Sequence, residues 1–200
     1  MTQVAVCSTG VSGRRARGQG RALQIWCVRM RHVPKGRLHL VRHGMPLIDP
    51  AVRSTDWQLD PERYDDVRAL RNSLPADAVW FSSPEVKAQQ TGRLLTDEPL
   101  GTVDGLREQV RSGWLDDLRT VVDRAFADPS VPALDGWESL NACRARVATT
   151  VAGIRAAHPN DDLVLVGHGT AWTVLVAEIT GTEPNLAALR AMAFPDLTVL

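Results

Sequence analysis

The chain has 200 residues, 44% of them hydrophobic, and its 23 basic residues balance 23 acidic ones. This length and composition suit one domain with a substantial core, and the neutral balance gives no reason to expect a nucleic-acid or membrane partner. No apolar run approaches the length of a membrane span. Three cysteines, without a Cys-x-x-Cys pair, indicate neither a disulfide scaffold nor a zinc site. We therefore expect a cytoplasmic protein.

The first 37 residues differ in charge from the rest of the chain. They contain eight Lys and Arg residues and no Asp or Glu, which leaves 15 basic and 23 acidic residues in the remainder. Residues 10–21 are rich in Gly and Arg, a composition typical of disorder. We predict a basic, disordered extension over 1–35 and a folded domain over 36–200. A transit peptide, or a start codon at Met30, would explain the same composition.

Apolar runs alternate with helical patterns from residue 37 onward. Residues 37–41 are predicted as a strand. Asp60-Pro61-Glu62 predicts the start of a helix that runs to about residue 74, because a capping carboxylate precedes proline at the first helical position. The apolar run 78–81 is the next predicted strand. Ser83-Pro84-Glu85 repeats the helix-start signal for a helix to about residue 95, and a short strand is expected near Thr102.

The segment 105–137 interrupts this alternation, and we predict that it forms a small cap inserted over one edge of the domain. It holds a helical pattern near 115–127. Beyond it we predict, in chain order, a helix over 138–157, a strand over 163–166, a helix over 170–180 that stops at Gly181, a helix over 183–192 and a strand over 197–200. Strands that alternate with helices predict βαβ units. The fold class is therefore α/β, a three-layer α/β/α sandwich with a mostly parallel central sheet.

Two of the predicted strands end in His-Gly, at Arg42-His43-Gly44 and at Gly167-His168-Gly169. The carboxyl ends of parallel strands meet at one edge of the sheet, so both histidines are expected in the same crevice. A neutral imidazole is a nucleophile near pH 7, and a second, protonated imidazole beside an arginine would neutralise a dianion such as phosphate. Arg42 offers forked donors to phosphoryl oxygens. Gly44 lets backbone N–H groups approach the same anion.

The chain resembles the histidine phosphatase superfamily, also called the phosphoglycerate-mutase-like family, from residue 37 to the C-terminus. The resemblance rests on blocks in the family's order, namely Leu40-Val41-Arg42-His43-Gly44, Ser82-Ser83-Pro84-Glu85-Val86-Lys87-Ala88-Gln89-Gln90-Thr91, Leu106-Arg107-Glu108, Gly136-Trp137-Glu138-Ser139-Leu140 with Trp137 inserted, and Gly167-His168-Gly169.

The resemblance implies a role for each site residue. His43 would become transiently phosphorylated, while Arg42 and His168 would stabilise charge on the phosphoryl oxygens. Glu108 would protonate the leaving alkoxide and then take a proton from the hydrolytic water. We expect the pKa of Glu108 to be raised for this task by a partly apolar cap. Gly44 and Lys87 would complete the phosphate site, and neither a metal nor a cofactor is expected.

Two positions depart from the family pattern. Lys87 replaces the family's second arginine and lacks its bidentate fork. Other arginines could reach the phosphate in its place, namely Arg53, Arg111 or Arg144. Asp49 stands where the family often has Asn, so we expect its carboxylate to face away from the phosphate or to contact a cationic part of the substrate.

The remaining candidates lie outside these motifs. Trp57, Trp114 and Trp137 are expected to border the mouth of the site, where they either wall an organic substrate or pack the cap. We interpret His32, His39 and His158 as structural or exposed residues. Cys143 is predicted to lie in the core, because no matched cationic residues surround it.

These observations predict a cofactor-independent, histidine acid phosphatase-like phosphomonoesterase that hydrolyses a small phosphorylated metabolite through a phosphohistidine. A phosphoglycerate-mutase-type phosphotransferase is an alternative, although only about 30 residues are available for a larger cap. A catalytically altered relative that binds or converts another anionic ligand is a second alternative. A metallohydrolase is a third, but no His-x-His or His-x-x-x-His spacing supports it. The sequence leaves substrate identity and oligomeric state open.

Overall fold

The computed structural model describes residues 35–200, so the predicted N-terminal extension lies, apart from Lys35, outside the described residues. None of the helices in this described range is long and apolar enough to cross a membrane. The described chain begins with a backbone hydrogen bond from Lys35 N to Pro159 O (3.0 Å), just ahead of the first strand.

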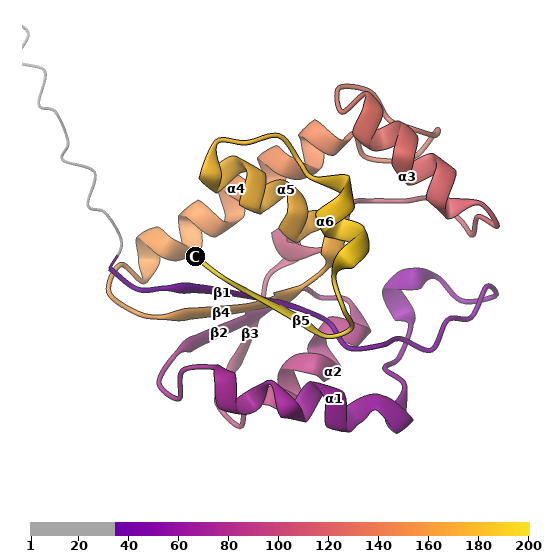
Figure 1. The fold of residues 1–200 in the computed structure, drawn as a ribbon. Coiled ribbons are helices and arrows are strands. Elements are labelled where there is room, and N and C mark those ends of the chain that lie inside the picture. Colours follow the sequence, from indigo (N-terminus) through magenta and orange to yellow (C-terminus); the bar gives the residue numbers. More distant parts are fainter. Residues whose placement is uncertain (1–34) are drawn as a thin grey trace, which may run out of the picture. The chain divides into compact units, whose positions relative to one another are not determined.

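A five-stranded sheet forms the centre of the domain (Figure 1). Its order is β3-β2-β4-β1-β5, with bounds β1 (Leu38–Arg42), β2 (Val79–Ser82), β3 (Leu100–Thr102), β4 (Leu163–Gly167) and β5 (Asp196–Val199). The first four strands are parallel and β5 is antiparallel to β1. Arg42 pairs with Gly167, and Ser82 pairs with Val166. The carboxyl ends of β1, β2 and β4 therefore lie side by side.

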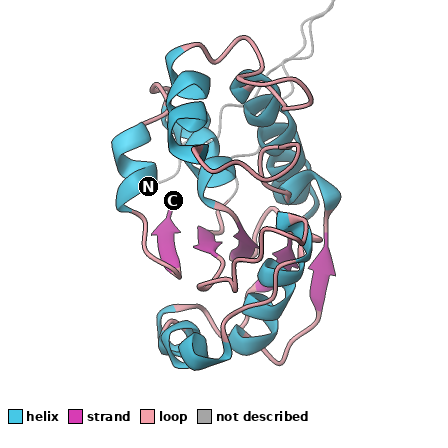
Figure 2. Ribbon diagram, turned by 90° about the vertical axis from the view of Figure 1, so that its right-hand side faces the viewer, coloured by secondary structure: helices cyan, strands magenta, loops and turns pink. Residues whose placement is uncertain are grey.

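Helices cover both faces of the sheet, which confirms the predicted α/β/α sandwich (Figure 2). One face is covered by α1 (Tyr64–Ala69) and α2 (Val86–Leu95). The other is covered by α4 (Leu140–Ala157) and α5 (Gly169–Thr180), with α6 (Leu186–Ala191) beside α5. The segment predicted as a cap holds the short 3₁₀ turn η4 (Asp104–Leu106) and α3 (Leu118–Ala127).

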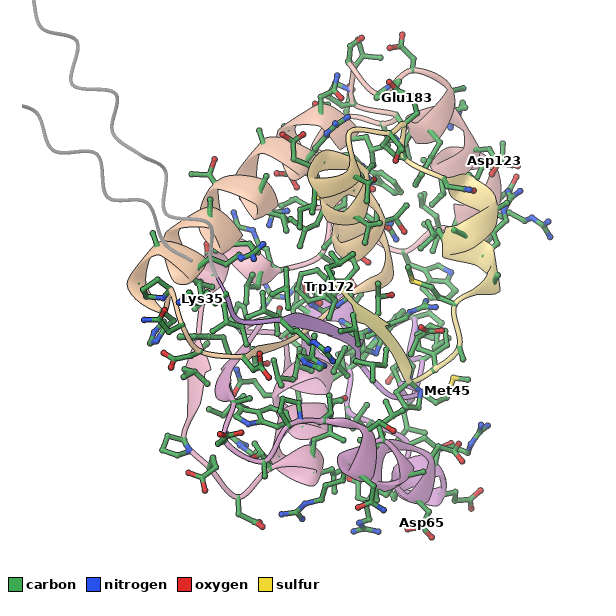
Figure 3. The ribbon with its side chains drawn as sticks, turned by 60° about the vertical axis from the view of Figure 1, so that its left-hand side comes forward. Lys35, Met45, Asp65, Asp123, Trp172 and Glu183 are labelled. Carbon is green, nitrogen blue, oxygen red and sulfur yellow. The ribbon has the colours of Figure 1, made fainter. Side chains whose placement is uncertain are left out.

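The core consists of two layers because the side chains of each strand alternate between the faces. Leu38 and Leu40 of β1 pack with α4 and α5, whereas Val41 packs with α1 and α2. Trp172 lies inside the first layer, and its indole N–H donates to Val41 O (2.9 Å) (Figure 3). This bond joins α5 to the end of β1, next to the first His-Gly motif.

Two predicted helices begin or run differently in the structure. The helix predicted from Asp60 is broken into η2 (Pro61–Arg63), α1 and η3 (Arg71–Ser73), although the Asp60 carboxylate accepts from Glu62 N (3.0 Å) as predicted for a cap. The helix α2 begins at Val86 and not at Ser83. Ser83 and Glu85 instead turn their side chains toward other partners at the carboxyl edge of the sheet.

Candidate active site

His43 follows directly after β1 and is only 5% exposed. Its Nδ1 lies 2.7 Å from Gly44 O. Because a carbonyl oxygen can only accept, Nδ1 carries the proton and Nε2 holds the lone pair. Burial, with the nearby Lys87 cation, lowers the pKa of His43 well below its usual value. The ring is therefore a neutral imidazole near pH 7, and its lone pair on Nε2 has the electronic form that a nucleophile needs.

His168 follows β4, and its ring centroid lies 5.2 Å from that of His43. The structure thus brings both predicted histidines together at the carboxyl edge of the sheet. His168 Nε2 is 2.8 Å from Ser83 Oγ, whereas Nδ1 is buried without a hydrogen-bond partner among the described residues. Burial lowers the pKa of His168 to about 3, although the Glu108 carboxylate opposes the shift. The expectation of a protonated second imidazole is therefore wrong for this state of the site.

Arg42 is the last residue of β1, and its side chain contacts the segment that leads into β5. Its Nη1 donates to Met192 O (2.8 Å), and its guanidinium carbon lies 3.5 Å from the centroid of the Phe194 ring. The Phe194 ring centroid is in turn 5.3 Å from that of His43. A carbonyl and an aromatic face thus orient the guanidinium beside the nucleophile.

Gly44 packs closely against α1 and α2. Its N–H donates to Thr91 Oγ1 (3.0 Å), and a Cβ at this position would lie 2.5 Å from Val67 Cγ2. Glycine is therefore required here by packing. Its N–H bonds to a side chain of α2, so its role in binding phosphate stays a prediction.

The Glu108 side chain contacts the first turn of α5, a helix that lies about 60 residues further along the chain. Its Oε1 accepts from Gln109 N (2.8 Å) and Ala171 N (3.0 Å), and its Oε2 accepts from Thr170 N (3.2 Å). The carboxylate thus satisfies two N–H groups of the first helical turn, where the helix dipole also favours negative charge.

The pKa of Glu108 is lowered to about 2, so the expected rise is wrong. Burial acts to raise it, but this effect is outweighed by the charges of Arg111 and His168 and by hydrogen bonds from the N–H groups of Gln109 and Thr170. All of these partners favour the ionised carboxylate. In this state of the site Glu108 is ionised and acts as a hydrogen-bond acceptor.

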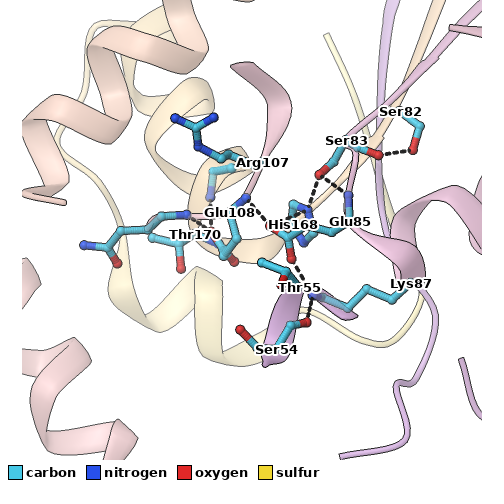
Figure 4. Close-up of polar contacts among 12 residues, drawn as sticks. Ser54, Thr55, Ser82, Ser83, Glu85, Lys87, Arg107, Glu108, His168 and Thr170 are labelled. Atoms are coloured by element: carbon cyan, nitrogen blue, oxygen red, sulfur yellow. Dashed lines mark hydrogen bonds and ion pairs between the residues drawn. The ribbon is translucent and has the colours of Figure 1, made fainter. Parts of the chain in front are cut away.

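Lys87 is paired with a buried carboxylate that sequence reasoning missed. Its Nζ donates to Glu85 Oε2 (2.5 Å) and to Ser54 O (2.5 Å) (Figure 4). Glu85 Oε1 accepts from Glu108 N (2.9 Å) and lies 3.4 Å from His168 Nε2. The available signal was an acidic residue two positions before the lysine, but the Ser-Pro-Glu order is also a helix-start pattern. Whether Lys87 binds phosphate stays a prediction.

Of the three arginines that could substitute for the family's second arginine, two pair with carboxylates outside the cavity lining described below. Arg53 pairs with Asp56 (3.2 Å) in an exposed turn, and Arg144 pairs with Glu178 (2.6 Å). Arg111 does reach the site, where its Nη2 donates to Thr170 Oγ1 (2.8 Å).

Two of the three tryptophans lie together at the surface. The ring centroids of Trp57 and Trp114 are 6.3 Å apart, and Trp114 is 46% exposed. Trp137 is buried and packs against Arg111, whose guanidinium carbon lies 5.1 Å from the ring centroid. The Asp49 carboxylate accepts from Ala51 N (2.9 Å) in an exposed turn. Whether it faces away from the phosphate or contacts a cationic part of the substrate stays a prediction.

The remaining candidates have structural surroundings. Cys143 lies in the core as predicted, and burial raises the pKa of its thiol. His158 lies 3.3 Å from Asp161, and His39 is buried in the sheet. His32 lies outside the described residues. Within residues 35–200, no three His, Cys, Asp or Glu side chains form a group that could hold a metal ion.

A cavity of about 260 Å³ is lined by Arg42, which precedes His43 in the chain, and by Gly169 and Thr170, which follow His168. The other lining residues are Glu108, Arg111, Arg190 and the apolar side chains of Val122, Leu189, Met192 and Phe194. Arg190 pairs with Asp123. Arg42 and Arg111 are therefore the two lining arginines without an ion-pair partner among the described residues, in a space large enough for a small organic phosphate.

The α/β/α fold, with histidines after two parallel strands of its sheet, defines a protein of the phosphoglycerate-mutase-like class. The model of the histidine phosphatase superfamily (branch 1) matches residues 38–200, and the chain belongs to this superfamily.

The comparisons also identify individual proteins that this chain is similar to. It is 26% identical over 171 residues to the uncharacterized phosphatase PhoE of Bacillus subtilis (strain 168), an alignment that covers 76% of this chain and 81% of that protein. The fold is similar to that of a phosphoserine phosphatase from Entamoeba histolytica in complex with 3-phosphoglyceric acid (TM-score 0.67, 17% identity, 82% of this chain and 89% of that one). It is also similar to a mycobacterial glucosyl-3-phosphoglycerate phosphatase (TM-score 0.65, 21% identity, 82% and 89%).

Proposed function

We propose that this chain is a cytoplasmic phosphatase that hydrolyses the phosphomonoester of a small metabolite through a phosphohistidine at His43, without a metal or cofactor. The observation that carries the proposal is the hydrogen bond between His43 Nδ1 and Gly44 O, because it leaves a lone pair on Nε2 of a neutral ring. Membership of the superfamily and relatives that are named phosphatases support this chemistry.

The first half-reaction transfers the phosphoryl group to the protein. His43 Nε2 attacks phosphorus as the bond from phosphorus to the alcohol oxygen breaks. Arg42 and His168 lie beside His43, where they can stabilise charge on the phosphoryl oxygens. In the second half-reaction water attacks phosphorus and the N–P bond breaks. Inorganic phosphate is released and His43 returns to its neutral form.

Glu108 handles the proton in both half-reactions. Its carboxylate is ionised in the free site, but a phosphate dianion beside it disfavours a second negative charge. The complex therefore holds one proton between the substrate phosphate and Glu108, and this proton goes to the leaving oxygen. The ionised carboxylate then accepts a proton from the attacking water.

Replacement of the nucleophile tests the proposal. The variant His43→Ala should lose at least about 1,000-fold in kcat with p-nitrophenyl phosphate. The matched control is His158→Ala, which removes an imidazole outside the site and should keep the rate of the unmodified protein. Turnover by His43→Ala equal to that of the unmodified protein would exclude the phosphohistidine. Trapped phosphate that is acid-stable, and therefore bonded to a residue other than histidine, would also contradict it, because phosphohistidine is acid-labile.

A second candidate function is that of an altered relative that binds or converts a different anionic ligand. The buried pair of Lys87 with Glu85 favours it, because the cation at the family's second arginine position is neutralised. Absence of turnover by both the unmodified protein and His43→Ala, across a panel of phosphorylated metabolites, would support this candidate over the phosphatase.

A further inference from the structure

The Lys87 ammonium has little capacity left for a ligand. Its side chain is 6% exposed, and two of its three N–H donors point at Glu85 Oε2 and Ser54 O, both at 2.5 Å. The Glu85 carboxylate neutralises its charge within the protein. Lys87 and Glu85 together thus add no net charge to the site.

Glu85 is as firmly held as its partner. Its side chain is 6% exposed, and it accepts from the backbone N–H of Glu108 in addition to Lys87. Freeing Lys87 for a substrate would leave this carboxylate buried without a countercharge, which is strongly unfavourable. The two residues therefore act as one internal unit that supports the Glu108 loop.

Arg111 has the opposite properties. Among the described residues no carboxylate lies within ion-pair distance of its guanidinium, and its Nε is buried without a hydrogen-bond partner. Thr170 Oγ1 accepts from Nη2 at 2.8 Å, and Trp137 packs against the guanidinium. The side chain is held in place. Its charge lowers the pKa of Glu108, but Glu108 does not form an ion pair with it, so the guanidinium stays open to an added anion.

Arg111 also faces the same space as the residues assigned to phosphate. It lines the cavity of about 260 Å³ together with Arg42 and Glu108. Phe194, another wall of this cavity, lies 5.3 Å from the His43 ring centroid to centroid. A dianion at this position would meet two guanidinium groups.

The geometry points to Arg111 as the second cation that binds the substrate phosphate, in the role that the family motif would give to Lys87. This inference rests on the proposed function for the identity of the anion. It assigns Arg42 and Arg111 to the ligand, and Lys87 with Glu85 to the interior of the protein.

Binding of inorganic phosphate, measured by isothermal titration calorimetry, tests this assignment without turnover. Loss of a charge-assisted hydrogen bond in Arg111→Gln should weaken the Kd at least about 10-fold. Arg111→Lys keeps the charge and should weaken it less. The matched control is Arg144→Gln, an arginine that pairs with Glu178 away from the site.

A double variant tests the other half of the inference. Glu85→Gln with Lys87→Met removes both charges together, keeps an acceptor for Glu108 N–H, and should leave the phosphate Kd within about 3-fold. Phosphate binding by Arg111→Gln equal to that of the unmodified protein would overturn the assignment, as would an equal loss in the double variant. If Arg111→Gln does not fold, as judged by its thermal transition, Arg111→Lys against Arg144→Lys decides the question.

The two proposals fail in different ways. Full turnover by His43→Ala would exclude the phosphohistidine mechanism and leave the calorimetric result for Arg111 standing. Unchanged phosphate affinity in Arg111→Gln, with turnover lost in His43→Ala, would exclude Arg111 as the second cation and leave the mechanism standing.

Discussion

Arg146 on α4 forms a bidentate ion pair with Glu138, which lies two residues before that helix. Arg146 Nε is 2.9 Å from Glu138 Oε1, and Arg146 Nη2 is 2.6 Å from Glu138 Oε2. The guanidinium also donates to three carbonyl oxygens of the loop that carries the proposed proton donor, those of Gly105 (2.9 Å), Arg107 (3.0 Å) and Glu108 (3.1 Å). One arginine therefore positions the backbone of Glu108.

Substitution of Arg146 should affect both stability and activity. In Arg146→Met, loss of one partner of this largely buried pair should cost about 3 to 5 kcal/mol of unfolding free energy. The three freed carbonyls should also let Glu108 move, so kcat/KM should fall about 100-fold, since small displacements of catalytic groups are costly. Denaturant unfolding and steady-state kinetics measure the two effects, with Arg144→Met on the same helix as control. A folded Arg146→Met with unchanged kcat/KM would contradict the positioning role.

Gly169 lies in close contact with Arg42, and a methyl group there should disturb the phosphate site. A Cβ at Gly169 would lie 3.2 Å from Arg42 Nε and 2.8 Å from Leu189 Cδ1. We expect Gly169→Ala to lower kcat/KM by about 10-fold or more. The control is Gly153→Ala on α4, where a Cβ meets no atom within 4 Å; it should keep its activity and gain about 0.5 to 1 kcal/mol. Equal kcat/KM in both variants would refute this prediction.

The low pKa of Glu108 makes a testable contribution to stability. The folded pKa of about 2 lies below the ordinary value of 4.5, so ionisation favours the folded state above about pH 4.5, and this contribution is lost as pH falls toward 2. At about 1.4 kcal/mol per pKa unit it amounts to roughly 3 kcal/mol. The stability difference between the protein and Glu108→Gln, measured by denaturant unfolding, should shrink as pH falls from 5 to 3. A difference that does not change with pH would disprove the shift.

The role of Glu108 as proton donor predicts a dependence on the leaving group. An alkoxide needs a proton as it departs, whereas p-nitrophenolate does not. Glu108→Gln should therefore lower kcat for an alkyl phosphate by about 100-fold or more and affect p-nitrophenyl phosphate much less. Because Glu108 is ionised in the free site, the proton must enter with the substrate monoanion. For alkyl phosphates kcat/KM should thus fall above about pH 6, the second pKa of the phosphate. Equal losses with both substrates would argue against proton donation.

Lys87→Arg should not raise phosphatase activity. The ammonium is enclosed by Ser54 O and Glu85, and a planar guanidinium fits poorly into a site built around one small cation. We expect an equal or lower kcat/KM with p-nitrophenyl phosphate in steady-state kinetics. A clear increase would show that Lys87 contacts the phosphate, and that the arginine fork restores a contact the lysine makes weakly.

The strands and the two histidines could be predicted because their signals are local. Short strands rich in Leu and Val and followed by His-Gly mark β1 and β4, and parallel alignment then places His43 and His168 at one edge. The helix from Asp60 was less predictable. Its start signal held, but the segment is divided into η2, α1 and η3, and the local pattern does not contain these breaks.

Protonation states and charge pairing could not be predicted in this way. The expected high pKa of Glu108 and protonated His168 were both reversed, because the partners that decide them come from distant positions. Thr170 and Ala171 N–H reach Glu108 from more than 60 residues along the chain. Residue identity names the titratable groups, and burial and neighbours determine which proton each one keeps.

The sequence by itself thus determined the layered α/β fold and which strand ends carry imidazole and guanidinium groups, because side-chain alternation and strand termini are short-range properties. Only the tertiary structure decided how the charges are shared. In the structure Lys87 bonds to Glu85 and Ser54, and Arg111 lines the same cavity as Arg42 without an ion-pair partner among the described residues. The Glu108 carboxylate accepts from the first turn of α5. Pairing of charges depends on distances of a few ångströms between segments far apart in the chain, and folding alone sets those distances.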